Sequence, residues 1–251
     1  MALHPGFLTR PLAHRGFHDR AAGRPENSRA AIRAAIARGY GIEIDLQLSA
    51  DGQAVVFHDD TLDRLTDEVG PVRERPFAEL SRMVLKGSTE TIPSFSDVLD
   101  IVAGQVPLLV EIKDQDGALG PDVGALEKAA AAAARDYSGP LAFMSFNPHS
   151  MIALKRIAPK CVRGMTSDAF LEEDWPDVPA PVRQRLSGIP DLEAVGAAFV
   201  SHDAQALRMP RIAEIKAAGL PVLCWTIRTP EAEAEARRIA DNVTFEGYEA
   251  A

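Results

Sequence analysis

The stretch Gly41-Ile42-Glu43-Ile44-Asp45-Leu46-Gln47-Leu48 alternates apolar and polar side chains along its whole length. Alternate residues of a β-strand share a face, so Glu43 and Asp45 are predicted on one face, opposite the isoleucines and leucines. Such a strand suits a barrel, whose outer face packs against helices while its inner face lines the lumen. We therefore predict that both carboxylates face the lumen near its mouth.

Similar β-rich runs recur through the chain, and Ala-rich helical segments lie between them. This alternation predicts a parallel sheet, and eight strand candidates in 251 residues favour an α/β fold of the (β/α)8 TIM barrel type over an open doubly wound sheet. The expected strands are Pro11–His14, Gly41–Leu48, Leu108–Ile112, Leu141–Ser145, Cys161–Met165, Ala197–Ser201, Pro221–Thr226 and Val243–Glu246. The expected helices are Ser28–Arg38, Ser94–Val102, Ala125–Tyr137, Ser150–Ile157, Pro179–Leu186, Arg211–Ala218 and Pro230–Ala240.

Residues 1–251 are expected to form a single barrel domain, with one small insertion at approximately residues 59–92, after the second strand. Asp51-Gly52 is typical of a tight turn leading into Ala54–Phe57, and the charged segment that follows is longer than an ordinary βα connection. At the first helix we expect Asn27 to serve as the N-cap and Gly39 to end the helix.

Composition narrows the classes of partner. The formal net charge of −9 argues against nucleic acid, yet a small phosphate-bearing substrate stays open because a metal can reverse the field inside one pocket. No apolar run approaches the roughly 20 residues of a membrane span, so no stable membrane insertion is expected. The N-terminal residues lack the features of a signal peptide, which makes cytoplasmic the default location. Cys161 and Cys224 lie in apolar runs and are expected to be reduced thiols, and a homodimer stays open.

Glu43, Asp45 and Glu111 form a candidate metal site. Val110-Glu111-Ile112-Lys113 repeats the alternation of the earlier strand, which places Glu111 and Lys113 on one face of the next barrel strand. Three carboxylates without a Cys or His cluster favour one hard divalent ion, Mg²⁺ or Ca²⁺, over zinc. Lys113 can hold a phosphate oxygen. The alternative is that these carboxylates only form ion pairs with Lys or Arg.

Two histidines complete the chemistry. His14 and His58 each end a strand candidate, and a histidine pair can supply a general base and a general acid near neutral pH. Arg15 is expected to clamp the phosphate, and Trp225, at the end of the seventh strand, to wall the pocket or to pack in the core. His202 is a weaker candidate for the substrate side of the mouth.

With these residues assembled, the chain resembles the glycerophosphodiester phosphodiesterase family. The resemblance rests first on four motifs in order: His14-Arg15-Gly16, Pro25-Glu26-Asn27-Ser28, Glu43-Ile44-Asp45 and His58-Asp59. It continues through Thr61-Leu62-Asp63-Arg64-Leu65-Thr66, Ile92-Pro93-Ser94-Phe95, Glu111-Ile112-Lys113, Ser145-Phe146-Asn147 and Trp225-Thr226-Ile227, and so covers nearly the whole chain.

The resemblance implies a TIM barrel that hydrolyses glycerophosphodiesters to an alcohol and glycerol 3-phosphate. By position, it implies Glu43, Asp45 and Glu111 as metal ligands and His14 and His58 as the acid–base pair. It also implies that Arg15 and Lys113 hold the phosphate. Where family members often carry an Ile-x-Asp-x-Pro segment after the last strand, this chain has Thr244-Phe245-Glu246-Gly247-Tyr248, a departure at the pocket rim that concerns substrate choice more than chemistry.

Three rival functions stay open. One is a phospholipase C- or lysophospholipase D-like phosphodiesterase on lipid, which calls for an apolar rim or a basic membrane-facing loop. The long excursion is acidic instead. Another is a barrel that binds phosphodiesters without turnover, against which the intact candidate residues argue. The weakest is a sugar-phosphate isomerase, because a Gly-rich phosphate loop after the late strands is poorly represented by Phe245-Glu246-Gly247.

Overall fold

Strands and helices alternate along the chain in the computed structural model, which describes residues 1–251. The strands are β1 (Leu12–Ala13), β2 (Gly41–Leu48), β3 (Ala54–Val56), β4 (Leu108–Ile112), β5 (Leu141–Met144), β6 (Val162–Arg163), β7 (Met165–Ser167), β8 (Val200–Asp203), β9 (Val222–Ile227) and β10 (Asn242–Phe245). The α-helices are α1 (Gly6–Thr9), α2 (Arg29–Arg38), α3 (Phe77–Leu80), α4 (Phe95–Val102), α5 (Ala125–Ala133), α6 (Pro148–Ile157), α7 (Ala180–Leu186), α8 (Leu192–Val195), α9 (Pro210–Ala217) and α10 (Pro230–Ala236). Three 3₁₀ turns add η1 (Arg20–Ala22), η2 (Val72–Glu74) and η3 (Ala204–Ala206).

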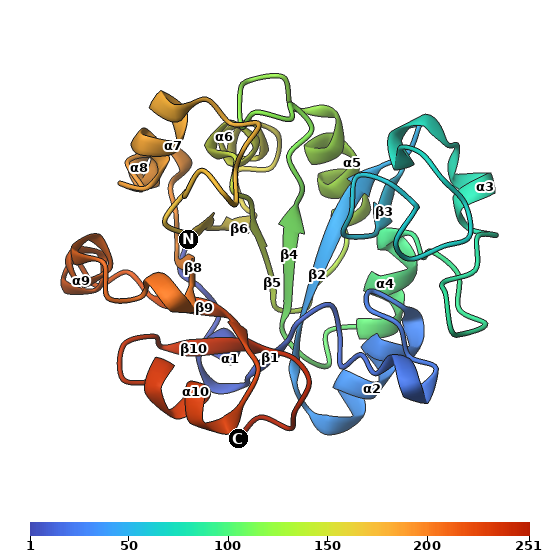
Figure 1. Ribbon diagram of the computed structural model, residues 1–251, viewed down its shortest axis with the longest axis horizontal. Coiled ribbons are helices and arrows are strands. Elements are labelled where there is room, and N and C mark those ends of the chain that lie inside the picture. The colour runs from blue at the N-terminus through green and yellow to red at the C-terminus, as the bar shows by residue number, and fades with distance from the viewer.

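The parallel strands form a ring, in the order β6-β5-β4-β2-β1-β10-β9-β8-β7, with helices around its outside (Figure 1). Only Gly164 separates β6, which pairs with β5, from β7, which pairs with β8. The Gly164 amide donates to the Phe143 carbonyl at 2.8 Å and the Met165 amide to the Phe199 carbonyl at 3.3 Å, so β6 and β7 are one strand that closes the ring. A Cβ at position 164 would lie 2.6 Å from the Phe199 ring, which explains the glycine. The predicted (β/α)8 barrel is confirmed.

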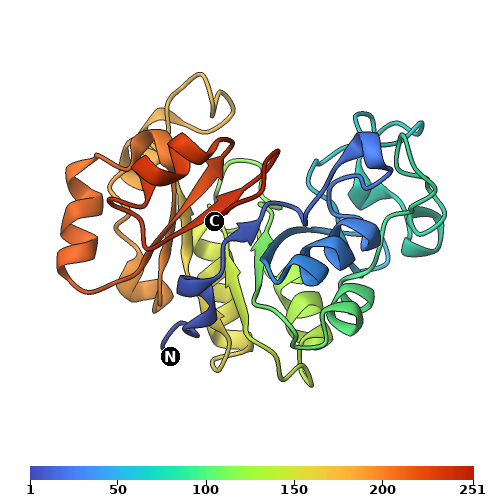
Figure 2. The ribbon, with the colours of Figure 1, turned by 90° about the horizontal axis from the view of Figure 1, so that it is seen from below.

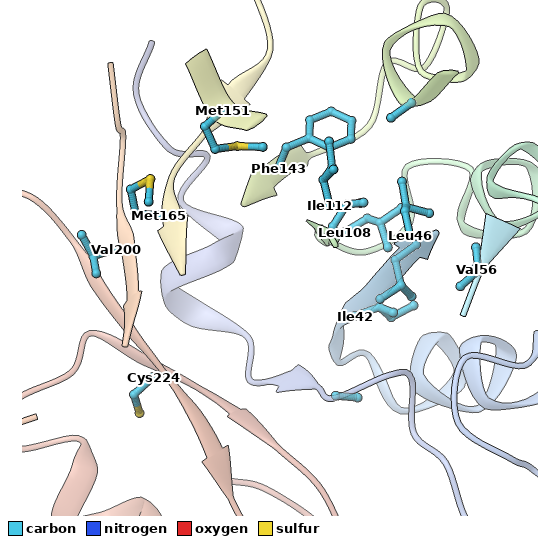
Figure 3. Packing of buried hydrophobic residues seen from close by; sticks show 14 of the residues in the cluster. Ile42, Leu46, Val56, Leu108, Ile112, Phe143, Met151, Met165, Val200 and Cys224 are labelled. Atoms are coloured by element: carbon cyan, nitrogen blue, oxygen red, sulfur yellow. The ribbon is translucent and has the colours of Figure 1, made fainter. Parts of the chain in front are cut away.

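Strand parity divides the apolar residues into two clusters. Ile42, Leu46 and Ile112 belong to the larger core between strands and helices, and Figure 3 shows the side chains of β2 and β4 gathered on that side, far from Val200 and Cys224 across the barrel. A smaller cluster fills the end of the lumen away from the site, where Phe7 of α1 packs with residues such as Leu109. In Figure 2, α1 lies near the N-terminus at one end of the strands. With this end filled by apolar side chains, the polar residues collect at the other.

The excursion after β2 has a core of its own. β3 runs antiparallel to β2, and the turn between them contains Gly52 at φ +78°. From there to Ile92 the chain folds around an apolar cluster that is separate from the barrel core: Val55, Phe57, Leu62, Leu65, Val72, Leu80, Leu85 and Ile92. Because this cluster anchors the excursion, His58 and Asp59 at its base lie on a packed support.

Most predicted elements agree with the structure, and their ends differ by a few residues. Gly39 caps the end of α2 at φ +74°, as expected, but the expected Asn27 N-cap is wrong: Ser28 caps α2 by accepting from the Ala31 amide. Both cysteines are free thiols. The expected eleven-residue helix from Pro230 ends at Ala236, and no helix has the length and apolar character that a bilayer crossing needs.

Candidate active site

Three buried carboxylates meet inside the mouth of the barrel. Glu43 and Asp45 point inward from β2, and Glu111 points inward from β4, where it lies in register with Asp45. One carboxylate oxygen from each residue lies within 4.8 Å of the other two. Oxygen ligands gathered this closely suit a hard divalent cation, so the donor set fits the group that the sequence predicts.

The cluster carries more negative charge than its basic neighbours offset. Burial, reinforced by Asp45 and Glu111, raises the pKa of Glu43 well above its usual range. Burial alone would raise the pKa of Asp45 as well, but nearby positive charges, of which Lys113 has the largest effect, lower it strongly. The Lys113 ammonium lies 3.0 Å from Asp45 and 2.9 Å from Glu111, and its own pKa is raised because these carboxylates outweigh its burial. Lys113 therefore offsets part of the charge of the three carboxylates.

His14 is held by a carboxylate from the other end of the chain. Its Nδ1 lies 2.5 Å from Glu246 Oε2, and the same oxygen lies 3.4 Å from His18 Nε2. Arg228 binds the second oxygen of Glu246 at 2.8 Å. Burial lowers the pKa of His14 in spite of Glu246. Burial would raise the pKa of Glu246, but its hydrogen bonds to His14 and His18 and the charge of Arg228 lower it. The contact leaves Nε2 as the His14 nitrogen available to a substrate.

His58 belongs to a chain of ion pairs that runs around the rim. Its Nδ1 lies 2.7 Å from Asp59, which Arg64 holds at 2.6 Å. Arg64 also binds both oxygens of Glu26 at 2.8 Å, and Glu26 lies 2.6 Å from Arg15 Nη1. Two guanidinium groups thus overcome burial and lower the pKa of Glu26 to about 2. These contacts fix Arg15 and His58 relative to one another.

The loop after β1 brings one backbone donor and one side-chain donor to the carboxylates. The Arg15 amide donates to Glu43 Oε2 at 3.0 Å, and the Asn27 side chain donates to Asp45 Oδ2 at 2.9 Å. Both residues have positive φ, 54° and 59°. Gly16 allows this loop to reach α2, because a Cβ there would lie 2.9 Å from the Ala31 backbone. Asn27 is thus committed to Asp45, which is why it does not cap the helix.

These groups line a central cavity of about 170 Å³. Its walls also carry the hydroxyls of Thr166 and Thr244 and the Arg15 Nε, three buried polar atoms without a hydrogen-bond partner in the chain. Arg15 Nε lies 3.6 Å from Asp45, too far for a hydrogen bond. A buried donor without a partner is costly, so the cavity is built to meet an oxygen-rich ligand.

All eight residues named from the sequence line this cavity: His14, Arg15, Glu43, Asp45, His58, Glu111, Lys113 and Trp225. His202 does not, because it shares the outward face of β8 with Val200, and its Nδ1 lies 2.8 Å from Ser167 Oγ. Sequence reasoning missed Thr166, Thr244 and the role of Glu246. A usable signal was present, since Val243-Thr244-Phe245-Glu246 alternates apolar and polar side chains as β2 does, which places Thr244 and Glu246 on one face.

Comparison with known proteins shows the family. The model of the glycerophosphoryl diester phosphodiesterase family matches residues 14–244. The chain belongs to this family. The match confirms the predicted family and, with it, the prediction of a phosphodiesterase enzyme, and the two ends of the matched region fall on His14 and Thr244 in the cavity wall.

Relatives in this family extend the match to sequence and structure. A glycerophosphodiester phosphodiesterase from Caldanaerobacter subterraneus is 32% identical over 174 residues, which cover 65% of this chain and 69% of that protein. The structure of an Oleispira antarctica phosphodiesterase in complex with the product sn-glycerol-3-phosphate is 27% identical with a TM-score of 0.78, and the match covers 96% of this chain and 93% of that one. A glycerophosphodiester phosphodiesterase from Thermotoga maritima, 22% identical over 93% of this chain and 92% of its own, shares the fold with a TM-score of 0.69.

Proposed function

We propose that this chain hydrolyses small glycerophosphodiesters to an alcohol and glycerol 3-phosphate, using one divalent cation, Mg²⁺ or Ca²⁺. The observation that carries the proposal is the set of three buried carboxylates within 4.8 Å of one another, in a cavity that also contains two histidines. Glu43, Asp45 and Glu111 would hold the cation. When bound, such a cation polarises a phosphoryl oxygen and stabilises the charge that develops on it.

Lys113 and Arg15, two of the basic side chains of the cavity, bind the phosphate. Lys113 supplies a buried ammonium, and the unpartnered Nε of Arg15 supplies a directed donor. Because Glu26 fixes the Arg15 guanidinium through Nη1, the donor is in place before the substrate arrives. The hydroxyls of Thr166 and Thr244 can bind further oxygens of the substrate.

His14 acts as the general base and His58 as the general acid. Burial favours the neutral form of His14, which is the form that accepts a proton from the attacking hydroxyl of water or of the substrate glycerol. Glu246 on Nδ1 stabilises the imidazolium that results. His58, oriented through Nδ1 by Asp59, then donates a proton to the leaving alkoxide.

A small diester fits this mouth better than a bilayer lipid. Five large hydrophobic side chains are exposed in the whole chain: Met1, Val69, Val84, Ile157 and Leu171. Of these, only Leu171 lines a cavity at the mouth of the barrel. A lipid-cleaving site calls for a larger exposed apolar rim than one side chain provides.

The test is release of glycerol 3-phosphate from glycerophosphocholine, measured with EDTA and again after Mg²⁺ or Ca²⁺ is restored. EDTA should abolish turnover, and Glu43→Gln should lower kcat/KM on the order of 10³-fold, because the cation accounts for several kcal/mol of transition-state stabilisation. Glu231→Gln, at an exposed glutamate without an ion pair, is the matched control. Full turnover after verified metal removal would contradict the role of the cation. Binding of the diester without any turnover would contradict the proposed hydrolase function itself.

A further inference from the structure

The central cavity continues into two larger hollows at the mouth. One, of about 510 Å³, shares His58, Glu111 and Lys113 with it. The other, of about 580 Å³, shares Trp225 and Arg228, and we call it the tryptophan cavity. Phe146 lines all three spaces, and Trp175 stands between the two hollows as a wall of both. A phosphodiester has two alcohol arms, so the mouth offers a separate outlet for each.

Aromatic rings wall the tryptophan cavity. The Phe146 ring centroid lies 4.9 Å from that of Trp175 and 5.6 Å from that of Trp225, with the planes tilted by 61° and 86°. The indole N–H of Trp175 donates to Asp168 at 2.8 Å, and that of Trp225 donates to the Ser201 carbonyl at 3.2 Å. Because the N–H of each indole is already hydrogen-bonded within the protein, the rings offer a ligand in the cavity their carbon surfaces.

The same cavity carries negative charge that the chain does not neutralise. Asp168, Asp174 and Asp203 line it, and none of the three forms an ion pair with an Arg or Lys. Burial and the neighbouring aspartates raise the pKa of both Asp168 and Asp203. Arg228 is the single basic residue of the lining, and Glu246 already binds it at 2.8 Å.

The first hollow shares Phe146, Trp175 and Asp174 with the tryptophan cavity but differs in its other charged groups. Its acidic groups nearest the catalytic residues have partners within the chain: Asp59 with Arg64, Glu111 with Lys113, and Asp114 with the Gly117 and Leu119 amides. Aromatic faces beside unneutralised carboxylates are the combination that binds quaternary ammonium and amine groups. The tryptophan cavity adds Trp225, Asp168 and Asp203 to the groups that both hollows share, whereas the first hollow adds the Lys113 ammonium, so the tryptophan cavity is the better site for a cation.

We propose that the tryptophan cavity receives the alcohol head group and selects a cationic one, an amino alcohol or a quaternary ammonium such as choline. The proposal rests on the phosphodiesterase function proposed above and adds its substrate class. Trp175 and Trp225 contact the cation with their ring faces, and Asp203 and Asp174 balance its charge. The glycerol arm then occupies the first hollow.

The test is a ratio of specificities. The kcat/KM for glycerophosphocholine divided by that for glycerophosphoglycerol, whose head group is neutral, should be on the order of tenfold in the unmodified protein. Trp175→Leu keeps an apolar side chain but removes the aromatic face, and Asp203→Asn keeps the acceptor for the Gln205 amide but removes the charge. Each should bring the ratio close to one, whereas Asp100→Asn, at an exposed aspartate on α4, should not change it.

A failure of head-group selection can be distinguished from a failure of the phosphodiesterase function. A ratio near one in the unmodified protein overturns the cationic selection, and so do variants that lower both rates equally, because such a loss is structural. If neither diester is hydrolysed, the phosphodiesterase proposal fails, and calorimetric titration of each diester into the protein decides the selectivity directly. Tighter binding of glycerophosphocholine then supports the head-group site, and equal affinities overturn it.

Discussion

The two histidines of the site each bind a carboxylate through Nδ1, yet different parts of the fold supply the two pairs. His14 follows β1 and contacts Glu246, which follows β10, 232 positions later. His58 contacts the next residue, Asp59, at the base of the excursion. The first pair is also more buried, with 13% and 19% of the two side chains exposed, against 30% and 22% in the second.

The difference assigns the two pairs to different tasks. The His14–Glu246 pair exists only when the barrel is closed, because β1 and β10 are the neighbouring strands that bring its members together. The His58–Asp59 pair is local in sequence, and it depends on Arg64 in the excursion for its orientation. The closed barrel therefore provides the buried base, and the excursion provides the more exposed acid, so both parts belong to one site.

The largest expected effect comes from removing either imidazole. His14→Ala and His58→Ala should each lower kcat/KM by about 10²–10⁴-fold, the usual contribution of general acid–base catalysis. A p-nitrophenyl ester of glycerol phosphate, whose leaving group needs little protonation, should restore much of the rate of His58→Ala and little of that of His14→Ala. Rates of phenol and alcohol release measure both. His149→Ala, at an exposed histidine, serves as the control.

The opposite pattern of rescue would exchange the two roles. If the activated ester rescued both variants equally, the distinction between a buried base and an exposed acid would be wrong, although the phosphodiesterase proposal would survive. Either histidine proving dispensable for the natural diester would contradict the two-histidine mechanism itself.

A smaller effect is expected from Glu246→Gln. Neutral His14 is the active form, so the rate falls as the pH drops through its pKa, which burial places below the ordinary value of about 6.5. Glu246 raises that pKa, and a neutral amide removes this influence, so the acid limb of the kcat/KM profile should move to lower pH. The poorer orientation of the imidazole should also lower kcat by about 10²-fold.

The matched control is Glu249→Gln, because Glu249 is an exposed C-terminal glutamate that pairs with Arg38 instead. Its pH profile should coincide with that of the unmodified protein. An acid limb that stays in place or moves upward in Glu246→Gln would show that the His14–Glu246 contact does not set the ionisation of the base.

Strand parity explains why so much of the site was predictable. An eight-residue alternating strand allows only one division of its residues between two faces, so Glu43 and Asp45 follow from their spacing, and Lys113 follows Glu111 in the same way. The barrel order then places β2 beside β4 and brings the three carboxylates together.

The parts that the sequence did not predict are contacts between distant positions. Nothing local in Phe245-Glu246-Gly247 indicates that its carboxylate lies on His14, because that contact requires closure of the ring. Asn27 is a residue type that often caps helices, yet its side chain binds Asp45, and the neighbouring Ser28 caps the helix. Trp175 lies in an irregular segment between β7 and α7, where no periodic pattern of side chains could predict its position at the mouth.

His202 sharpens the comparison as a third histidine whose Nδ1 partner is a neutral hydroxyl, that of Ser167. Burial lowers its pKa to about 4. Below the unfolded value of about 6.5 the unfolded chain binds a proton that the folded chain rejects, so stability is complete above pH 6.5 and is lost as the pH falls toward 4. Between pH 7 and pH 5 this one group should cost about 2 kcal/mol of unfolding free energy.

The double variant Ser167→Ala/His202→Leu removes both polar partners together, so no buried donor is left alone. Urea unfolding at pH 7 and pH 5 should show that the variant loses less stability on acidification than the unmodified protein, by about 2 kcal/mol. Its kcat/KM should be preserved, since His202 faces the helices. Equal losses in the two proteins would mean that His202 is protonated within the fold, and a fall in kcat/KM would place this histidine in the catalytic machinery after all. In that case the presence of a carboxylate partner on Nδ1 would no longer separate the histidines that transfer protons from the one that is only structural.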